Sequence, residues 1–165
     1  MKAILFKSLL PLAPAFTMIS CSADDSEGTP SDSRIVEEYT YDNDELQLAD
    51  MINQYRESIG LNSLEKINHV SYKSEEHNDY MIVNNVVNHD FFQQRSQNII
   101  EVLGAVKVNE NVAYNYMTAQ GALNAWLASP GHKANIEGDF THFGISVSIN
   151  PENGRKYYTN IFVKK

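Results

Sequence analysis

Glu110 is the side chain whose position in the sequence points most directly to chemistry. From residue 106 onward apolar residues recur with a period of two, and Val106, Val108 and Val112 share the parity of Glu110. If this segment is extended, it buries a carboxylate on an apolar strand face. A buried carboxylate without a partner is so costly that it becomes protonated or paired. We therefore expect Glu110 to meet a donor, a cation or a water-filled cleft, and its best candidate partners are His89 and His132.

His132 follows a helix that the sequence predicts clearly. Thr118 is a suitable N-cap, and the apolar residues after it recur at the i, i+3, i+4, i+7, i+8 spacing of a buried helix face, which carries Trp126 inward. Pro130-Gly131 is expected to stop this helix, which places the imidazole of His132 at a fixed point just outside a rigid element. Two structural alternatives remain open. His132 could hydrogen-bond the last helix carbonyls, and His89 could be a solvated loop residue.

Three helices are expected before the strand, over residues 44–59, 69–85 and 93–103. Gly60 stands where a left-handed C-terminal stop belongs, and Asn68 is a candidate N-cap. The inner face of the first helix is expected to carry Leu48, Ile52, Tyr55 and Ile59. The inner face of the second is expected to carry Val70, Ser74, His77 and Met81. His77 is expected to be a hydrogen-bonded interior histidine and not a ligand.

A hairpin is expected at the C-terminal end of the chain. Apolar residues alternate over residues 143–149, Asn153-Gly154 forms the turn, and residues 157–163 return. The tyrosines at 114, 116, 157 and 158 are expected to pack against the sheet, with a ligand groove as the alternative. Helices in both halves of the chain, with antiparallel strands between them, predict an α+β domain whose sheet is covered by helices.

Residues 1–20 have the layout of an export signal. A short basic region precedes residues 9–19, which are largely apolar and too few for a spanning helix of roughly 20 residues. Cys21, the only cysteine, follows Met18-Ile19-Ser20, a spacing that resembles a bacterial lipobox, in which the cysteine is lipidated. The alternative is an ordinary signal peptide with an incidental cysteine. We expect an exported protein that is anchored to the cell envelope through lipidated Cys21, with display at the cell surface as one outcome.

The segment 21–40 is expected to be a disordered acidic tether, because it is Ser-rich and has few large apolar groups. Removing residues 1–20 takes away two lysines and no acidic residue, so the net charge changes from −8 to −10. This charge argues against nucleic acid or an anionic membrane surface as a partner, since both need a basic stripe. Residues 41–165 suit one domain with a single core, which we expect to be a monomer.

Two motifs in this order carry a family resemblance. Glu110-Asn111-Val112-Ala113 precedes W-x-x-S-P-G-H-x-x-N-I at residues 126–136, and residues 53–64 are similar to N-x-x-R-x-x-x-G-L-x-x-L. The combination resembles the bacterial branch of the CAP superfamily (cysteine-rich secretory proteins, antigen 5 and pathogenesis-related 1 proteins; SCP domains) over about residues 44–162. The resemblance implies a three-layer α-β-α sandwich with a central, mainly antiparallel sheet.

The resemblance also implies a cleft, which in CAP domains is lined by two histidines and two acidic residues. His89 matches the first histidine, Glu110 the acid of E-N-[IV]-A, and His132 the second histidine. Where many eukaryotic relatives carry a second glutamate, this chain has Ser129, so three of the four positions are expected. Two neutral imidazoles and one carboxylate could hold Zn²⁺ or another divalent metal with an open fourth position.

Three classes of function follow from this resemblance. The favoured class is a lipid-anchored extracellular module, without enzymatic activity, whose cleft binds a lipid, glycan, protein or metal. The second is a metal-assisted hydrolase or peptidase, in which His89, Glu110 and His132 supply a general base or an activated water; the chain shows no convincing nucleophile. The third is an envelope adhesion or interaction module with a vestigial cleft, which the missing second acid favours.

Overall fold

The computed structural model describes residues 34–165, so Cys21 and the signal segment lie outside the described residues. The helices are α1 (Asn43–Ser58), α2 (Asn68–Asn84), α3 (Phe92–Leu103), α4 (Ala119–Ala128) and α5 (Pro130–Ile136). The strands are β1 (Glu65–Lys66), β2 (Lys107–Tyr114), β3 (His142–Ile149) and β4 (Lys156–Lys164).

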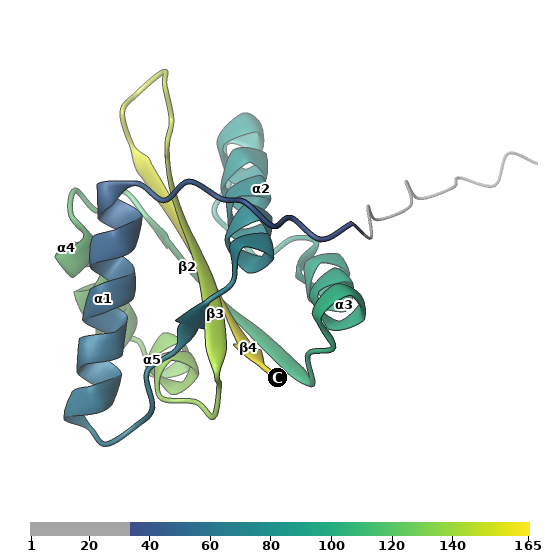
Figure 1. Cartoon of the computed structure of the whole chain (residues 1–165). Coiled ribbons are helices and arrows are strands. Elements are labelled where there is room, and N and C mark those ends of the chain that lie inside the picture. The colour runs from purple at the N-terminus through teal and green to yellow at the C-terminus, as the bar shows by residue number, and fades with distance from the viewer. Residues whose placement is uncertain (1–33) are drawn as a thin grey trace, which may run out of the picture.

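The strands form one sheet in the order β1-β3-β4-β2. β4 pairs antiparallel with β3 on one side and with β2 on the other, and β1 adds a short parallel edge to β3. Helices α1, α4 and α5 lie on one face of the sheet, and α2 and α3 lie on the other (Figure 1). The predicted α+β class and the three-layer α-β-α sandwich are therefore confirmed. β1 was not predicted, because two residues are too few to show a periodicity.

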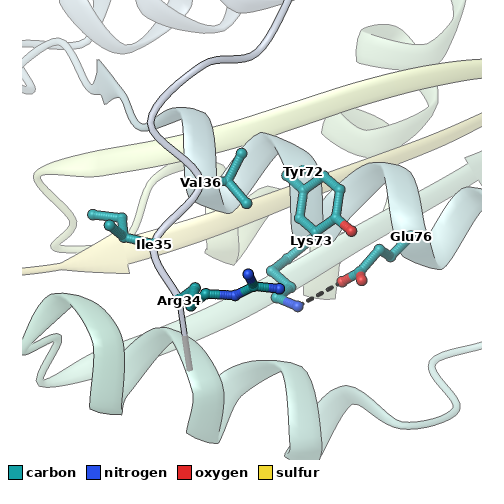
Figure 2. A pocket seen from close by; sticks show the side chains of 6 residues that line it. All are labelled: Arg34, Ile35, Val36, Tyr72, Lys73 and Glu76. Carbon is teal, nitrogen blue, oxygen red and sulfur yellow. Dashed lines mark hydrogen bonds and ion pairs between the residues drawn. The ribbon is translucent and has the colours of Figure 1, made fainter. Parts of the chain in front are cut away.

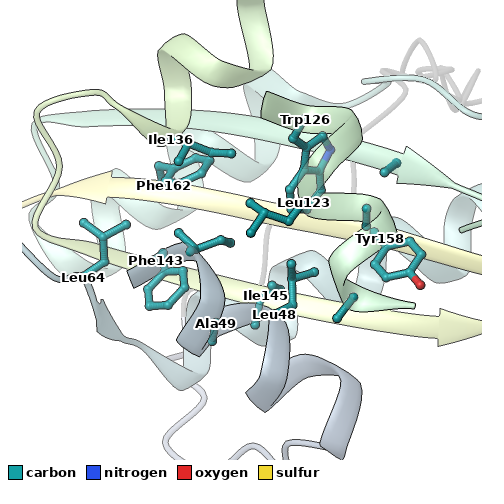
Figure 3. Packing of buried hydrophobic residues seen from close by; sticks show 14 of the residues in the cluster. Leu48, Ala49, Leu64, Leu123, Trp126, Ile136, Phe143, Ile145, Tyr158 and Phe162 are labelled. Atoms are coloured by element: carbon teal, nitrogen blue, oxygen red, sulfur yellow. The ribbon is translucent and has the colours of Figure 1, made fainter. Parts of the chain in front are cut away.

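The larger core cluster fills the layer between the sheet and helices α1, α4 and α5 (Figure 3). Leu48 from α1 and Leu123 from α4 are buried there with Phe162 of β4. Trp126 is only 1% exposed, and its indole Nε1 donates a hydrogen bond to the carbonyl oxygen of Val112 at 3.0 Å. The predicted inward face of α4 is confirmed, and the indole fastens α4 to β2.

The predicted inner face of α1 is wrong at its C-terminal end. Helix α1 ends at Ser58, and Ile59 beyond it is 46% exposed, whereas Arg56 is fully buried. The Arg56 guanidinium donates through Nη1 to the carbonyl oxygens of Ile136 at 2.6 Å and Gly138 at 3.0 Å. These hydrogen bonds satisfy the buried guanidinium and join α1 to the end of α5 and to the turn that follows it.

Helix α2 covers the opposite face of the sheet. Its predicted inner residues are all buried: Val70, Ser74, His77 and Met81. The helix approaches β3 most closely at Gly144, where a Cβ atom would lie 2.3 Å from the backbone nitrogen of Ser71. Glycine is therefore required at this position by space, and the close approach sets the depth at which α2 packs.

The described chain joins the domain before residue 41, the predicted boundary. The backbone N–H of Val36 donates to Nδ1 of His69 at 3.1 Å, and Asn68 donates to the carbonyl oxygen of Glu37 at 2.6 Å. Asn68 is therefore occupied by this contact and begins α2 instead of capping it. No helix within the described range is long and apolar enough to cross a membrane.

Candidate functional site

Glu110 lies inside the domain, on edge strand β2. It is 6% exposed and is buried together with Val108 and Val112, as their shared parity predicts. The prediction is wrong for Val106, which precedes the first residue of β2 and is exposed. Its register partner on β4 is Ile161, which is also buried. The carboxylate is thus withdrawn from solvent on an apolar strand face and needs charged or hydrogen-bonding partners.

Arg95 supplies the cation, and the sequence analysis did not identify it. From α3 its guanidinium contacts Glu110 three times: Nε to Oε2 at 3.0 Å, Nη2 to Oε2 at 2.8 Å and Nη2 to Oε1 at 2.9 Å. Nη1 donates to the carbonyl oxygen of Asp90 at 2.7 Å. Asn98 and Ile99 are buried on the same helix. That inner stripe was the available signal, because residues three and four positions apart share a helix face.

His89 provides the second contact to Glu110, with its Nδ1 2.8 Å from Oε1. It lies in the loop between α2 and α3, and its side chain is 52% exposed. The loop is held by Asp90, whose carboxylate accepts hydrogen bonds from the Tyr80 hydroxyl at 2.9 Å and from Asn88 at 2.8 Å. A carboxylate at Nδ1 favours the tautomer that carries its proton there, which leaves the lone pair of the neutral ring on Nε2.

His77 lies beside the same carboxylate but does not bind it. Its Nε2 is 4.0 Å from Glu110 Oε1, too far for a hydrogen bond. Neither ring nitrogen has a hydrogen-bond partner in the described part of the chain, so the prediction of a hydrogen-bonded histidine is wrong. Arg95 and His89 already donate hydrogen bonds to the Glu110 carboxylate, so His77 is not bonded to it. Burial lowers the pKa of His77 to about 4, despite the opposing effect of Glu110, so this imidazole is neutral at physiological pH.

The ionisation of Glu110 is decided by two opposing effects. Burial alone would raise its pKa, but the hydrogen bond from His89 and the positive charge of Arg95 outweigh burial, so the pKa lies below its ordinary value. Glu110 is therefore an anion whose charge is balanced inside the domain by Arg95.

His132 lies within a helix and not past the end of one. The predicted stop is a junction: α4 ends at Ala128, Ser129 links the helices, and Pro130 is the first residue of α5. Proline suits a first helical position, because its missing N–H has no partner there. Within residues 34–165 no hydrogen bond joins the His132 ring to the α4 carbonyls. Burial lowers the pKa of His132, and the charge of His89 lowers it further, so the ring is neutral.

Asparagine side chains tie α5 to β2. Asn111 donates to the carbonyl oxygen of His132 at 3.0 Å. Asn135 donates to the carbonyl oxygen of Glu110 at 3.2 Å and to the side chain of Asn111 at 2.8 Å. These contacts fix the His132 backbone relative to the strand that carries Glu110.

A pocket of about 330 Å³ opens beside His132. Its aromatic lining comes from Tyr114, Tyr116 and Trp126, and its polar lining from Ser129 and His132. Aliphatic side chains complete it: Val87, Val112, Ala113 and Ala125. Of the four tyrosines expected to pack, Tyr157 and Tyr158 are buried, and Tyr114 packs against Tyr157 with ring centroids 4.7 Å apart while its edge lines the pocket. Tyr116 lines the pocket and is 37% exposed.

The three predicted site residues are brought together only in part. Glu110 and His89 share a hydrogen bond, whereas His132 lines the neighbouring pocket. No group of three or more His, Cys, Asp or Glu side chains in the described residues is arranged to hold a metal ion. Both Glu110 oxygens accept hydrogen bonds from Arg95. The donor set predicted for Zn²⁺ therefore does not fit a divalent ion in this arrangement.

A separate hollow of about 260 Å³ lies where the N-terminal segment crosses α2 (Figure 2). Lys73 and Glu76 form an ion pair of 2.7 Å at its edge. The full lining is Arg34, Ile35, Val36, Tyr72, Lys73 and Glu76. None of the predicted site residues lines this hollow.

The comparison with known families agrees with this architecture. The model of CAP, the cysteine-rich secretory protein family, matches residues 49–163. The chain belongs to this family. The uncharacterized membrane protein YlbC of Bacillus subtilis is 34% identical over 125 residues, which are 73% of this chain and 34% of that protein. The chain thus spans about a third of the length of this relative.

Solved structures place this CAP domain among bacterial relatives. An extracellular protein containing an SCP domain from Bacillus anthracis is 27% identical, with a TM-score of 0.66 over 74% of this chain and 40% of that chain. An outer surface protein from Borrelia burgdorferi is 20% identical, with a TM-score of 0.68 over 79% of this chain and 99% of that chain. At that identity the second likeness supports the fold alone.

Proposed function

We propose that this chain is an exported, lipid-anchored CAP protein that binds an uncharged ligand, a neutral saccharide, in the pocket beside His132. The lining of the pocket carries the proposal: three aromatic side chains and two small polar ones, with no lysine, arginine, aspartate or glutamate among the described residues that form it. Mostly apolar walls with a few placed polar groups are typical of ligand sites. The charges of Glu110 and Arg95 lie outside this lining and balance each other.

A neutral sugar ring matches this lining better than the other ligand classes do. Such a ring has an apolar C–H face that suits the ring of Tyr116, which keeps 37% of its surface exposed. Its hydroxyl groups both donate and accept, as do the Ser129 hydroxyl and a neutral His132 imidazole. The volume of about 330 Å³ is near the lower end for ligand sites, which favours a compact ring over a long acyl chain.

The test uses Trp126, the only tryptophan in the chain, as a reporter in the wall of the pocket. N,N′,N″-triacetylchitotriose and maltotriose are titrated into the mature chain carrying Cys21→Ser, while the tryptophan emission is followed. We expect a saturable change that His132→Ala removes. His142→Ala is the matched control, because His142 begins β3 and does not line the pocket.

Other outcomes of the same titration refute the saccharide assignment. Saturable binding of palmitate or of a short peptide, with no response to saccharides, would show that the ligand is a lipid or a peptide and not a saccharide. No response to any probe would favour the envelope interaction module with a vestigial cleft.

The proposal of a lipid anchor is based on Cys21, which is outside the described residues, and on the apolar segment that precedes it. The extracellular relative from Bacillus anthracis and the membrane description of YlbC support export. We expect Cys21→Ser to abolish metabolic acyl labelling and to release the protein from the membrane fraction. Unchanged labelling in this variant would refute the anchor.

Hydrolysis is a second candidate, favoured by the pairing of His89 with Glu110. The carboxylate on Nδ1 leaves Nε2 of an exposed imidazole as a base, as in carboxylate–histidine pairs of hydrolytic enzymes. Peptide and ester substrates assayed with wild type and His89→Ala test this candidate. Turnover that persists in His89→Ala would exclude His89 as the base.

A further inference from the structure

The carboxylate of Glu110 has no acceptor position to spare. Oε1 receives Nη2 of Arg95 at 2.9 Å and faces Nδ1 of His89 at 2.8 Å. Oε2 receives Nε and Nη2 of Arg95 at 3.0 and 2.8 Å. Two short contacts to each oxygen use the roughly four lone-pair sites that an ionised carboxylate offers.

Around this carboxylate lie two imidazoles at nearly the spacing of metal ligands. Zinc binds imidazole nitrogen and carboxylate oxygen at about 2.0–2.2 Å, so ligands in a tetrahedral shell are roughly 3.3 Å apart. Nδ1 of His89 lies 2.8 Å from Glu110 Oε1, and Nε2 of His77 lies 4.0 Å from it. One distance is shorter and the other longer than the roughly 3.3 Å that separates two zinc ligands. Shifts of roughly 0.5–0.7 Å would bring the His89 and His77 nitrogens to that distance from Glu110.

His77 is the residue that this cluster leaves unexplained. It is 1% exposed, and both of its ring nitrogens lack a hydrogen-bond partner among residues 34–165. A buried polar group without a partner is costly, so its position beside Glu110 needs a reason. The guanidinium of Arg95 lies against both oxygens of Glu110, where an ion shared with His77 and His89 would have to bind.

We propose that Arg95 is a built-in counter-ion for Glu110, and that its guanidinium keeps His77, His89 and Glu110 from closing around a divalent metal ion. The guanidinium gives the buried carboxylate a permanent positive partner, because arginine stays protonated at every physiological pH. The hydrogen bond between His89 and Glu110 therefore forms in this chain without any metal ion. This inference does not depend on the pocket beside His132, whose lining contains none of these four residues.

The experiment is a Co²⁺ titration of the mature chain carrying Cys21→Ser, followed by visible absorption, which distinguishes tetrahedral from octahedral cobalt. We expect wild type and Glu110→Gln to give the same weak or absent response. Arg95→Gln should bind Co²⁺ at least tenfold more tightly than wild type, with a tetrahedral spectrum. Arg95→Lys is the matched control, since it keeps a cation beside Glu110 and should behave as wild type does.

Two results would overturn the proposal. One is tight Co²⁺ binding by wild type that Glu110→Gln removes, because Glu110 would then be an open ligand despite Arg95. The other is a folded Arg95→Gln variant whose affinity equals that of wild type, or whose gained affinity survives His77→Ala. If Arg95→Gln does not fold, the comparison of wild type with Glu110→Gln still decides whether Glu110 is closed to metals.

Discussion

Breaking the buried ion pair between Arg95 and Glu110 should be among the most damaging single changes in the domain. The two side chains are only 9% and 1% exposed and share three contacts of 2.8–3.0 Å. Removing one partner of such a pair costs about 3–5 kcal/mol, because the other charge stays buried. Arg95→Met also loses the hydrogen bond to Asp90, worth about 1 kcal/mol, whereas the remaining contact from His89 offsets part of the loss. We expect a net loss of about 4 kcal/mol.

The complementary change should cost less. In Glu110→Gln the amide oxygen still accepts a hydrogen bond from the Arg95 guanidinium, which also keeps its bond to the Asp90 carbonyl oxygen. We therefore expect the free energy of unfolding to fall by about 2–3 kcal/mol. Arg95→Met combined with Glu110→Gln removes both charges. Because neither charge is then stranded, the double variant should be more stable than the sum of the single losses predicts, by about 2 kcal/mol.

Urea denaturation followed by Trp126 emission measures all four proteins of this cycle. Lys133→Met is the control, since Lys133 and Glu137 form a half-exposed pair at 3.6 Å that should contribute less than about 0.5 kcal/mol. Losses that add within about 0.5 kcal/mol would show that the two charges are not coupled. The assignment of Arg95 as the partner of Glu110 would then be wrong.

Three further substitutions test other parts of the structure. Burial lowers the pKa of His77 from 6.5 to about 4, so its neutral form stabilises the fold above pH 6.5 and this contribution is lost as the pH falls toward 4. Between about pH 7 and pH 5, wild type should therefore lose about 2 kcal/mol more stability than His77→Met does. Equal losses of the two proteins in urea titrations would contradict this. Trp126→Ala should cost about 3–5 kcal/mol in denaturation followed by circular dichroism, and a loss below about 1 kcal/mol would mean that the indole is not part of the core. Gly144→Ala should cost about 3 kcal/mol by the same method, because its Cβ would meet the α2 backbone, whereas Gly131→Ala, with nothing within 4 Å, should be nearly neutral; similar losses in both would refute the close approach.

The burial of Glu110 could be predicted from the sequence because strand parity is a local property. Val108 and Val112 mark one face, and the residue between them must share it. The need for a donor, a cation or a water-filled cleft followed from the same parity. The stripe of Arg95, Asn98 and Ile99 marks the inner face of α3, but it does not reveal that this face meets Glu110, because that contact depends on how α3 packs against β2.

The position of His132 shows a different limit. Pro130 after a helix is compatible with a stop and with the first residue of a new helix, and local propensity does not separate the two. The asparagine side chains of β2 and α5 bond across the two elements, and these contacts join residues more than twenty positions apart. The unpaired state of His77 was equally out of reach, since it depends on which neighbours occupy Glu110.

The central claim, that a neutral saccharide binds beside His132, is tested most directly by ¹⁵N–¹H correlation spectra of the histidine side chains during titration with N,N′,N″-triacetylchitotriose. His132 lines the pocket, His77 is sealed inside the domain, and His142 lies at the far end of β3. We predict that the His132 resonances move and saturate at the same saccharide concentration as the Trp126 emission, while those of His77 and His142 stay in place. Unmoved His132 resonances at saturating saccharide would contradict the account.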